Sequence, residues 1–267
     1  MTTQPTLFIP HGGGPCFFMD WTMGPADTWD KMGAWLRSLA DGLPEKPKGI
    51  VVISGHWEEK AYTVASVSKP EMIFDYYGFP PHTYQLSYPA PGSPELAERV
   101  RQLIAEAGLP AAISTDRGFD HGVFIPFLLA FPDADIPVVP LSLRTNMDPE
   151  EHLAVGRALA ALREEGILIV GSGMSYHNMR GYNTPGAAGV SARFDQWLTD
   201  AVESPDPADR WRKLAHWEET PEGRPSHPRE EHLLPLMVAA GAAAGEKGEK
   251  IFSDQVMIAT VSAFRFG

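Results

Sequence analysis

Three histidines follow apolar runs of strand length, and this placement indicates a metal or acid–base site. The pairs of run and histidine are residues 7–9 with His11, residues 50–53 with His56, and residues 167–170 with His177. Imidazole titrates near neutral pH and is the commonest protein ligand for transition metals. A lone histidine is usually a hydrogen-bonded polar residue, but three in one local context favour a shared site. Because ligand crevices form at the carboxyl ends of parallel strands, we expect these side chains to face one crevice.

The stretch HPREEHLLPL, residues 227–236, offers further candidate ligands near a predicted helix start. These candidates are His227, Glu230, Glu231 and His232. A charged cluster at a helix N-terminus more often caps the helix than takes part in catalysis. Since the histidines at the strand ends are expected to converge, His232 becomes the candidate third metal ligand beside His11 and His56.

His121 lies between acidic residues and a strongly apolar segment, in DRGFDHGVFIPFLLAF. We expect it at the mouth of a buried region, with Asp120 or Asp116 orienting its ring. Burial beside a metal and a carboxylate is the setting in which the pKa of an imidazole is adjusted for proton transfer. His152 is different, because it lies among acids in the first turn of a predicted helix, where a solvated or capping role is expected.

Three glycines follow His11 in HGGGP, where the absence of side chains lets the backbone approach a ligand closely. Gly13, in the middle of this run, is a candidate substrate contact. A phosphate-binding loop is the alternative, since glycine-rich loops also bind anions. The run lacks both the Lys-Ser/Thr ending of a P-loop and the spaced glycines of a dinucleotide fingerprint, and we expect no nucleotide cofactor.

Apolar runs alternate with helical patterns along the chain, which is typical of an α/β protein. Strands are predicted at residues 7–9, 50–53, 136–143, 167–170 and 256–261. Helices are predicted at residues 25–40, 94–107, 149–165, 190–202, 208–217 and 228–240, the last kinked or broken at Pro235. Gly171 and Gly173 are expected to end the strand before His177. We predict a single domain over residues 1–267 with a central, mostly parallel sheet covered by helices on both faces.

Composition excludes several classes of partner. The net charge of -12 and the pI near 5.2 oppose nonspecific binding to nucleic acid or to an anionic membrane surface. No apolar stretch reaches the roughly 18 residues of a membrane span, and the N-terminus lacks a basic targeting region. The single cysteine, Cys16, excludes an intrachain disulfide. We expect a cytoplasmic monomer or small homo-oligomer.

Residues 71–91, rich in Pro and Tyr, are expected to form an ordered loop that acts as a lid or pocket wall or packs its aromatic side chains.

Five segments carry a family resemblance that extends over nearly the whole chain. They are HGGGP, ISGHWEE, GFDHGVFIPF, GSGMSYHN and HPREEHLLPL, in this order. Together they resemble the class III extradiol ring-cleavage dioxygenases of the DOPA 4,5-dioxygenase type, in the LigB-like superfamily. The resemblance implies an α/β fold, a mononuclear non-haem Fe(II) for activity, and Zn(II) as a frequent occupant of the site in isolated protein. It also implies a catechol substrate whose ring is opened by O2 beside its two hydroxyls.

The resemblance assigns roles to five histidines. It implies that the metal ligands are His11, His56 and His232. His177 corresponds to the active-site histidine that approaches the metal, as a candidate fourth ligand, or moves protons, and His121 corresponds to the second catalytic histidine. Both histidines and Gly13 are candidate substrate contacts. The glycine run differs from the family's more usual Gly-Ser-Pro, and His232 stands where protocatechuate-cleaving relatives use a carboxylate.

Other functions stay open from the residues alone. A zinc-dependent hydrolase on the same scaffold would use a zinc-bound water. A non-catalytic metal-binding or ligand-binding member of the superfamily would keep the cleft without turnover, although it would not need all five histidines. A nucleophilic Cys16 is disfavoured, because a single cysteine in such a loop is more often a small buried residue.

Overall fold

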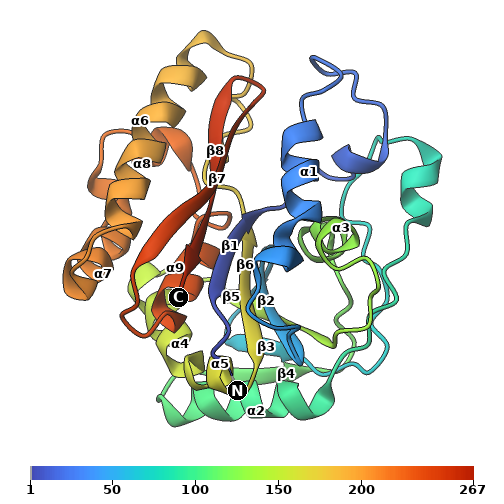
Figure 1. Cartoon of the computed structure of the whole chain (residues 1–267), viewed down its shortest axis with the longest axis vertical. Helices are drawn as coiled ribbons and strands as arrows, with labels where there is room; N and C mark the ends of the chain where they lie inside the picture. Colours follow the sequence, from blue (N-terminus) through green and yellow to red (C-terminus); the bar gives the residue numbers. More distant parts are fainter. Residues whose placement is uncertain (1) are drawn as a thin grey trace.

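One mixed sheet runs through the centre of the computed structural model, which describes residues 2–267 (Figure 1). Within these residues the strand order is β4-β3-β5-β2-β6-β1-β8-β7. The strands are β1 (Thr6–Pro10), β2 (Gly49–Glu59), β3 (Tyr62–Ala65), β4 (Ala111–Ser114), β5 (Val138–Arg144), β6 (Ile167–Gly173), β7 (Gly248–Val256) and β8 (Ala259–Phe266).

The four central strands β5, β2, β6 and β1 are parallel to one another. Antiparallel pairs join β8 to β1, β7 to β8, and β3 to β5. Side chains alternate between the two faces of β2, since Val51 and Ile53 lie in one core cluster whereas Ile50 and Val52 lie in the other. Burial on both faces explains why these strands have uninterrupted apolar sequences.

Helices cover both faces of the sheet, as predicted. They are α1 (Asp30–Arg37), α2 (Pro94–Glu106), α3 (His121–Ala130), α4 (Pro149–Leu159), α5 (Ala161–Glu164), α6 (Pro185–Val202), α7 (Pro207–Ala215), α8 (Gly223–Ser226) and α9 (Leu234–Ala242), with 3-10 turns at Cys16–Phe18, Leu39–Gly42, Pro81–Gln85 and Trp217–Glu219. Residues of α1 and α3 belong to the core on one face, and residues of α2, α4 and α9 belong to the core on the other (Figure 1). The mostly parallel α/β architecture is therefore confirmed.

Two helix starts follow the expected capping chemistry. The Ser93 side chain accepts a hydrogen bond from the backbone N–H of Leu96, and Asp148 accepts from the N–H groups of Glu150 and Glu151. Each cap is followed by proline in the first turn, where the missing N–H costs nothing. These local signals explain why the starts of α2 and α4 were predicted correctly. The single helix predicted at 149–165 is wrong, because it is divided at Ala160 into α4 and α5.

Other predicted boundaries are also wrong. The strand predicted at 256–261 is a hairpin, because Met257 and Ile258 have φ values of 47° and 64° and form the turn between β7 and β8. The helix predicted at 228–240 begins at Leu234, so Pro235 lies in its first turn and causes no kink. The helix predicted at 25–40 is α1 followed by a 3-10 turn. Gly171 and Gly173 lie inside β6 rather than beyond its end.

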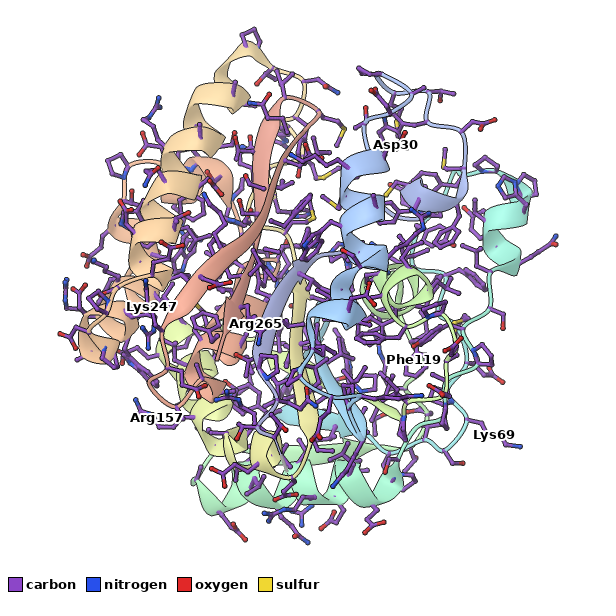
Figure 2. All side chains as sticks on the ribbon, viewed as in Figure 1. Asp30, Lys69, Phe119, Arg157, Lys247 and Arg265 are labelled. Atoms are coloured by element: carbon purple, nitrogen blue, oxygen red, sulfur yellow. The ribbon has the colours of Figure 1, made fainter. Side chains whose placement is uncertain are left out.

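Figure 2 shows how side chains fill the space between these elements. The labelled Lys69 and Lys247 are exposed at the outside, whereas the labelled Phe119 is fully buried. Across residues 2–267, no helix has both the length and the apolar character that a membrane crossing requires.

Candidate active site

Three histidines from distant segments bring their ring nitrogens together at the carboxyl end of the central strands. The Nε2 atom of His56 lies 3.3 Å from Nε2 of His11 and 3.2 Å from Nε2 of His232. One candidate ligand atom from each of the three residues falls within 4.8 Å of the others. His11 and His232 are buried, and His56 is partly exposed. The three residues expected to bind a metal therefore do converge.

Local strand structure positions His11 and His56. The N–H of His11 donates to the Gly173 carbonyl at 3.1 Å, which extends the pairing of β1 with β6 by one residue. His56 lies inside β2 rather than beyond it, in a segment where the register with β5 shifts between Ile53 and Glu58. Such an irregularity changes the direction of a side chain, and here it accompanies the placement of His56 at the site.

Glycines position His232, because they let the segment before α9 lie directly on the strand ends. A Cβ atom on Gly173 would lie 2.1 Å from the His232 carbonyl oxygen, and one on Gly55 would lie 3.0 Å from the Glu231 oxygen. The N–H of Met174 donates to the same His232 carbonyl at 3.0 Å. Gly173 therefore serves close backbone approach, which was not the role expected for it.

The outer nitrogens of the three rings face hydrogen-bond acceptors. Nδ1 of His11 lies 2.9 Å from the Gly12 carbonyl, Nδ1 of His232 lies 3.0 Å from Oε1 of Glu231, and Nδ1 of His56 lies 3.6 Å from Oδ2 of Asp75. Carbonyl and carboxylate oxygens only accept, so the proton of a neutral ring is favoured on Nδ1. The lone pair of each Nε2 then faces the common centre.

This donor set fits a divalent transition metal. Burial lowers the pKa of His11 and of His232 well below the usual value, and burial together with the neighbouring His121 lowers the pKa of His56 to about 3. Neutral imidazole is the form that binds metal ions. Metal–nitrogen bonds of about 2.0 to 2.1 Å place neighbouring nitrogens roughly 3 Å apart, close to the observed separations. Nδ1 contacts to carbonyl and carboxylate groups are also typical of metal-bound histidines.

His121 forms a pair with a carboxylate that sequence analysis did not identify. It is the first residue of α3, and its Nδ1 lies 2.8 Å from Oδ1 of Asp75, which also accepts from the His121 backbone N–H at 3.0 Å. Burial raises the pKa of Asp75, but the hydrogen bonds from His121 and the nearby imidazoles outweigh it and lower that pKa to about 2. Asp75 belongs to the loop 71–91, whose proline and tyrosine content was its only signal.

The prediction that Asp120 or Asp116 orients His121 is wrong. Asp120 is buried and instead accepts from the Ser54 hydroxyl at 2.7 Å and from the Arg117 guanidinium at 2.6 Å. Burial raises the pKa of Asp120, and the Arg117 charge opposes that shift. Asp116 accepts from Ser114. The Ser54 oxygen also accepts from the N–H of His56 at 3.2 Å, so this network holds the backbone of β2.

His177 forms the second histidine–carboxylate pair. Its Nδ1 lies 3.3 Å from Oε1 of Glu231, and its ring stacks on His232 with centroids 3.4 Å apart and planes at 16°. Burial raises the pKa of Glu231, but hydrogen bonding from His177 outweighs it, and the net shift is downward. His177, Glu231 and His232 form one group of neighbouring candidate ligands, whereas the central group consists of His11, His56 and His232.

Two other predicted histidine roles can be placed. His152 is fully buried, with Nδ1 2.6 Å from the Asp148 carbonyl and Nε2 accepting from the Arg144 N–H at 3.2 Å, so the expectation of a solvated residue is wrong. Helix α4 turns this side chain toward β5 rather than toward water. His227 is also buried, and its Nε2 lies 3.0 Å from the Ser175 carbonyl, outside the central group.

The five histidines line one cavity of about 490 Å³. Gly13 is part of its wall, and a Cβ atom at this position would lie 3.3 Å from the Trp29 ring. Tyr76 and Phe79 of the loop 71–91 also line it, so this loop forms a pocket wall, while Tyr88 of the same loop is buried in the core.

Comparison with known proteins gives consistent matches. The family model described as the catalytic LigB subunit of aromatic ring-opening dioxygenase matches residues 5–265. A 4,5-DOPA dioxygenase extradiol of Beta vulgaris is 43% identical over 91% of this chain and 88% of its own length. The dioxygenase tasH of Hapsidospora irregularis is 35% identical over 100% of this chain and 86% of its own length. The crystal structure of an uncharacterized protein from Escherichia coli K12 matches with a TM-score of 0.78 and 30% identity, covering 99% of this chain and 100% of that chain.

These matches span nearly the full chain at substantial identity, and membership of this family implies a metal cofactor, for which the histidine cluster is the candidate site. The chain belongs to the LigB family of class III extradiol dioxygenases and is an aromatic ring-opening dioxygenase.

Proposed function

We propose that the enzyme uses non-haem Fe(II) and O2 to open the ring of a catechol beside its two hydroxyl groups. The observation that carries the proposal is the convergence of three histidines and two histidine–carboxylate pairs on one pocket. Relatives named 4,5-DOPA dioxygenase extradiol support a catecholic substrate. Iron is proposed rather than zinc because zinc has no redox chemistry with which to activate O2.

The proposed metal ligands are His11, His56 and His232, through their Nε2 atoms. When bound there, Fe(II) would supply a site at which the two catechol oxygens and O2 meet, and would make the catechol hydroxyls more acidic. Glu231 and the Gly12 carbonyl keep two of the imidazoles in the tautomer that can ligate. Gly13 lets the backbone approach the bound ring.

His177 is the proposed general base. With Glu231 accepting the Nδ1 proton, Nε2 of His177 takes a proton from the second catechol hydroxyl, and the carboxylate stabilises the imidazolium that results. Because the ring is stacked on His232, it is held beside the metal ligands while the proton moves.

His121 is the proposed hydrogen-bond donor and later proton donor. Asp75 fixes its Nδ1, which leaves Nε2 to donate to an oxygen of the substrate or of O2 and to deliver a proton as the ring opens. The centroid of the His121 ring lies 3.9 Å from that of the His56 ring, whereas His177 stacks on His232, and both histidines line the same cavity. Two histidines with separate carboxylates let one accept a proton while the other donates one.

The test is metal replacement under controlled oxygen. Protein stripped of metal is loaded anaerobically with Fe(II) or with Zn(II), mixed with catechols and then exposed to O2. With Fe(II), we expect stoichiometric O2 uptake and a new visible absorption band from the ring-opened semialdehyde; with Zn(II), neither. Hydrolytic activity with Zn(II), or metal loading without O2 uptake across a broad catechol series, would contradict the proposal.

We further propose a cytoplasmic location, a monomer or small homo-oligomer, and no nucleic-acid or membrane partner.

A further inference from the structure

Among the described residues, those that line the active-site cavity carry no ionic side chain apart from histidine. Asp75 and Glu231 contact His121 and His177 but are not among the residues that line the cavity. Among the described residues that line it, none is Asp, Glu, Lys or Arg. The large side chains of the wall are apolar or aromatic: Trp21, Met23, Trp29, Tyr76, Phe79, Met174, Met179, Tyr182 and Met257. The volume of about 490 Å³ lies in the range typical of pockets for drug-sized ligands. A catechol ring alone is much smaller than such a ligand, so the cavity has room for a large substituent.

The polar groups of this wall are either engaged or neutral. The Tyr76 hydroxyl donates to the Thr83 carbonyl at 2.6 Å, and the Tyr182 hydroxyl donates to the Tyr176 carbonyl at 2.8 Å. The indole N–H groups of Trp21 and Trp29 are buried and have no hydrogen-bond partner among the described residues. They carry no charge and therefore supply no countercharge to an ionic ligand. Burial of a carboxylate or an ammonium group without a countercharge is unfavourable.

Two exposed apolar side chains line this cavity. Met23 is 54% exposed and Met179 is 69% exposed, and both line the cavity. The other large apolar residues exposed in the described chain are Tyr77 and Ile258, which are next in sequence to the lining residues Tyr76 and Met257. Single exposed apolar residues are common, but two that line the same cavity favour an apolar contact there. Flexible methionines suit ligands of varied shape.

We propose that the preferred substrate is a catechol with a bulky, apolar and uncharged substituent, such as an aryl or branched alkyl group, that extends from the histidines to the cavity mouth. The inference rests on the proposed function and deepens it. A charged side chain, whether the carboxylate of a catecholic acid, the ammonium group of a catecholamine or both in a catecholic amino acid, would enter a wall that supplies no opposite charge.

The test compares four catechols substituted at the same ring position, with the Fe(II)-loaded protein. They are 4-phenylcatechol, which is neutral, dopamine, which is cationic, 3,4-dihydroxyphenylacetate, which is anionic, and L-DOPA, which is zwitterionic. We expect kcat/KM for 4-phenylcatechol to exceed that of each charged compound by at least about tenfold, with the difference mainly in KM. A second readout is calorimetric binding of 4-phenylphenol and 4-hydroxyphenylacetate to metal-free protein, where the neutral phenol should bind more tightly.

A positive charge introduced at the mouth should reduce or abolish the preference over the anionic catechol. Met179→Arg places a guanidinium at a site that is 69% exposed, so the fold should tolerate it. It should raise kcat/KM for 3,4-dihydroxyphenylacetate relative to 4-phenylcatechol by about tenfold. The matched control is Arg180→Ala at the exposed neighbouring position, which should leave the ratio unchanged.

The outcomes separate this inference from the proposed function. If none of the four catechols consumes O2, the proposed function fails. If all four catechols are consumed but a charged compound has a kcat/KM equal to or higher than that of 4-phenylcatechol, the proposed function stands and the substrate inference is overturned. Loss of activity toward the anionic catechol in Arg180→Ala would also overturn it, because Arg180 would then supply the missing charge. If Met179→Arg changes the molecular mass of the protein in solution but leaves the substrate selectivity unchanged, Met23 and Met179 form a contact between copies of the chain. This result would also overturn the substrate inference.

Discussion

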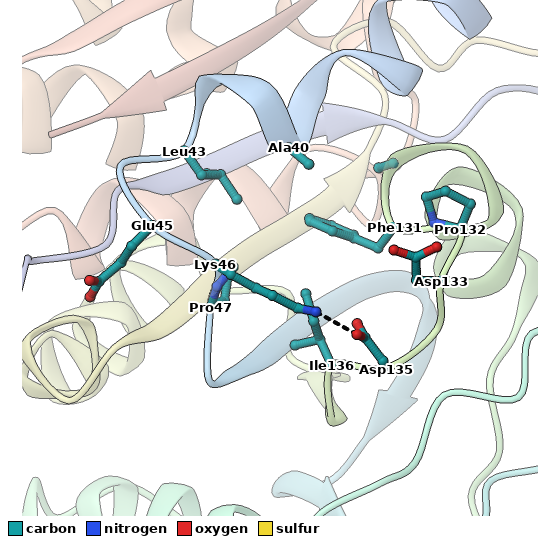
Figure 3. A pocket seen from close by; sticks show the side chains of 11 residues that line it. Ala40, Leu43, Glu45, Lys46, Pro47, Phe131, Pro132, Asp133, Asp135 and Ile136 are labelled. Carbon is teal, nitrogen blue, oxygen red and sulfur yellow. Dashed lines mark hydrogen bonds and ion pairs between the residues drawn. The ribbon is translucent and has the colours of Figure 1, made fainter.

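The two ends of the central sheet carry pockets of opposite character. At the carboxyl end, His11, His56 and His232 come from three separate segments and line a cavity of about 490 Å³. At the amino end, a cavity of about 280 Å³ lies between the turns that lead into β2 and β5 (Figure 3). Its charged side chains include Lys46 and Asp135, which form an exposed ion pair with each other.

The difference lies in how the polar groups are used. Every group of three or more candidate metal ligands found among residues 2–267 lies at the carboxyl end. At the amino end, Lys46 and Asp135 neutralise each other beside Phe131 and Ile136, and the cavity wall contains no histidine within the described chain. Side chains in the loops after parallel strands converge, whereas the turns before them mainly connect elements. We therefore expect the carboxyl end of the sheet to carry the chemistry and the amino end to contribute only to packing. Substitutions at the two ends test this expectation.

The largest effect is expected from His56→Ala, which removes the central member of the ligand triad. Loss of one of three ligands should reduce metal content to background and activity by more than about a hundredfold, since loss of even an outer-shell partner costs 10- to 100-fold. Elemental analysis of purified protein, together with O2 uptake, measures both. Full metal content in the variant would remove His56 from the ligand set.

His177→Ala separates ligation from proton transfer at the same end of the sheet. Without the proposed base, kcat should fall by about 10² to 10⁴, while the metal content stays at the wild-type level. Stopped-flow turnover and elemental analysis on the same sample distinguish the two roles. Loss of the metal would instead make His177 a fourth ligand.

Asp75→Asn tests the carboxylate that tertiary structure adds to the site. The amide keeps the size of the side chain but removes the charge that faces Nδ1 of His121. We expect kcat to fall by roughly 10- to 100-fold, with metal content little changed, because His121 loses its fixed orientation. The control is Asp116→Asn, which should leave kcat unchanged because Asp116 accepts a hydrogen bond from Ser114 and not from His121. An equal effect of both changes would contradict the assignment.

His152 should make stability depend on pH far from the metal site. Burial lowers its pKa to about 4, so between that value and the usual 6.5 the unfolded chain binds a proton that the folded chain does not. This contribution is present above pH 6.5 and is lost as the pH falls, by about 2 kcal/mol between pH 7 and pH 5. Urea unfolding of wild type and His152→Gln at both pH values, without metal, measures the difference. Parallel losses in the two proteins would exclude His152 as the cause.

The smallest effect is expected at the amino-end pocket. Lys46→Met removes an ion pair whose side chains are 62% and 51% exposed. Such pairs contribute at most about 1 kcal/mol, so the free energy of unfolding should change by less than that and kcat by less than about twofold. Thermal unfolding and steady-state assays check both values. A large loss of turnover would show that the two ends of the sheet are coupled.

The helical and strand elements were predictable where their signals are local. Ser93 and Asp148 mark helix starts through their side-chain hydrogen bonds, and the apolar run at 167–170 marks a strand buried on both faces. Helix α3 was not recognised, since nearly all its residues are buried and no polar face reveals a helical period. The turn at Met257 and Ile258 was missed because neither residue is a usual turn former.

The sequence by itself determined the kinds of residue at the strand ends, the alternation of strands and helices and the family, because each of these is a property of short segments read in order. Only the tertiary structure decided which atoms meet. His232 reaches His56 across 176 positions because glycines in β2 and β6 admit its backbone, and Asp75 reaches His121 from a loop without regular periodicity. Such contacts depend on strand order and on the close approach of distant backbones, which local patterns do not encode.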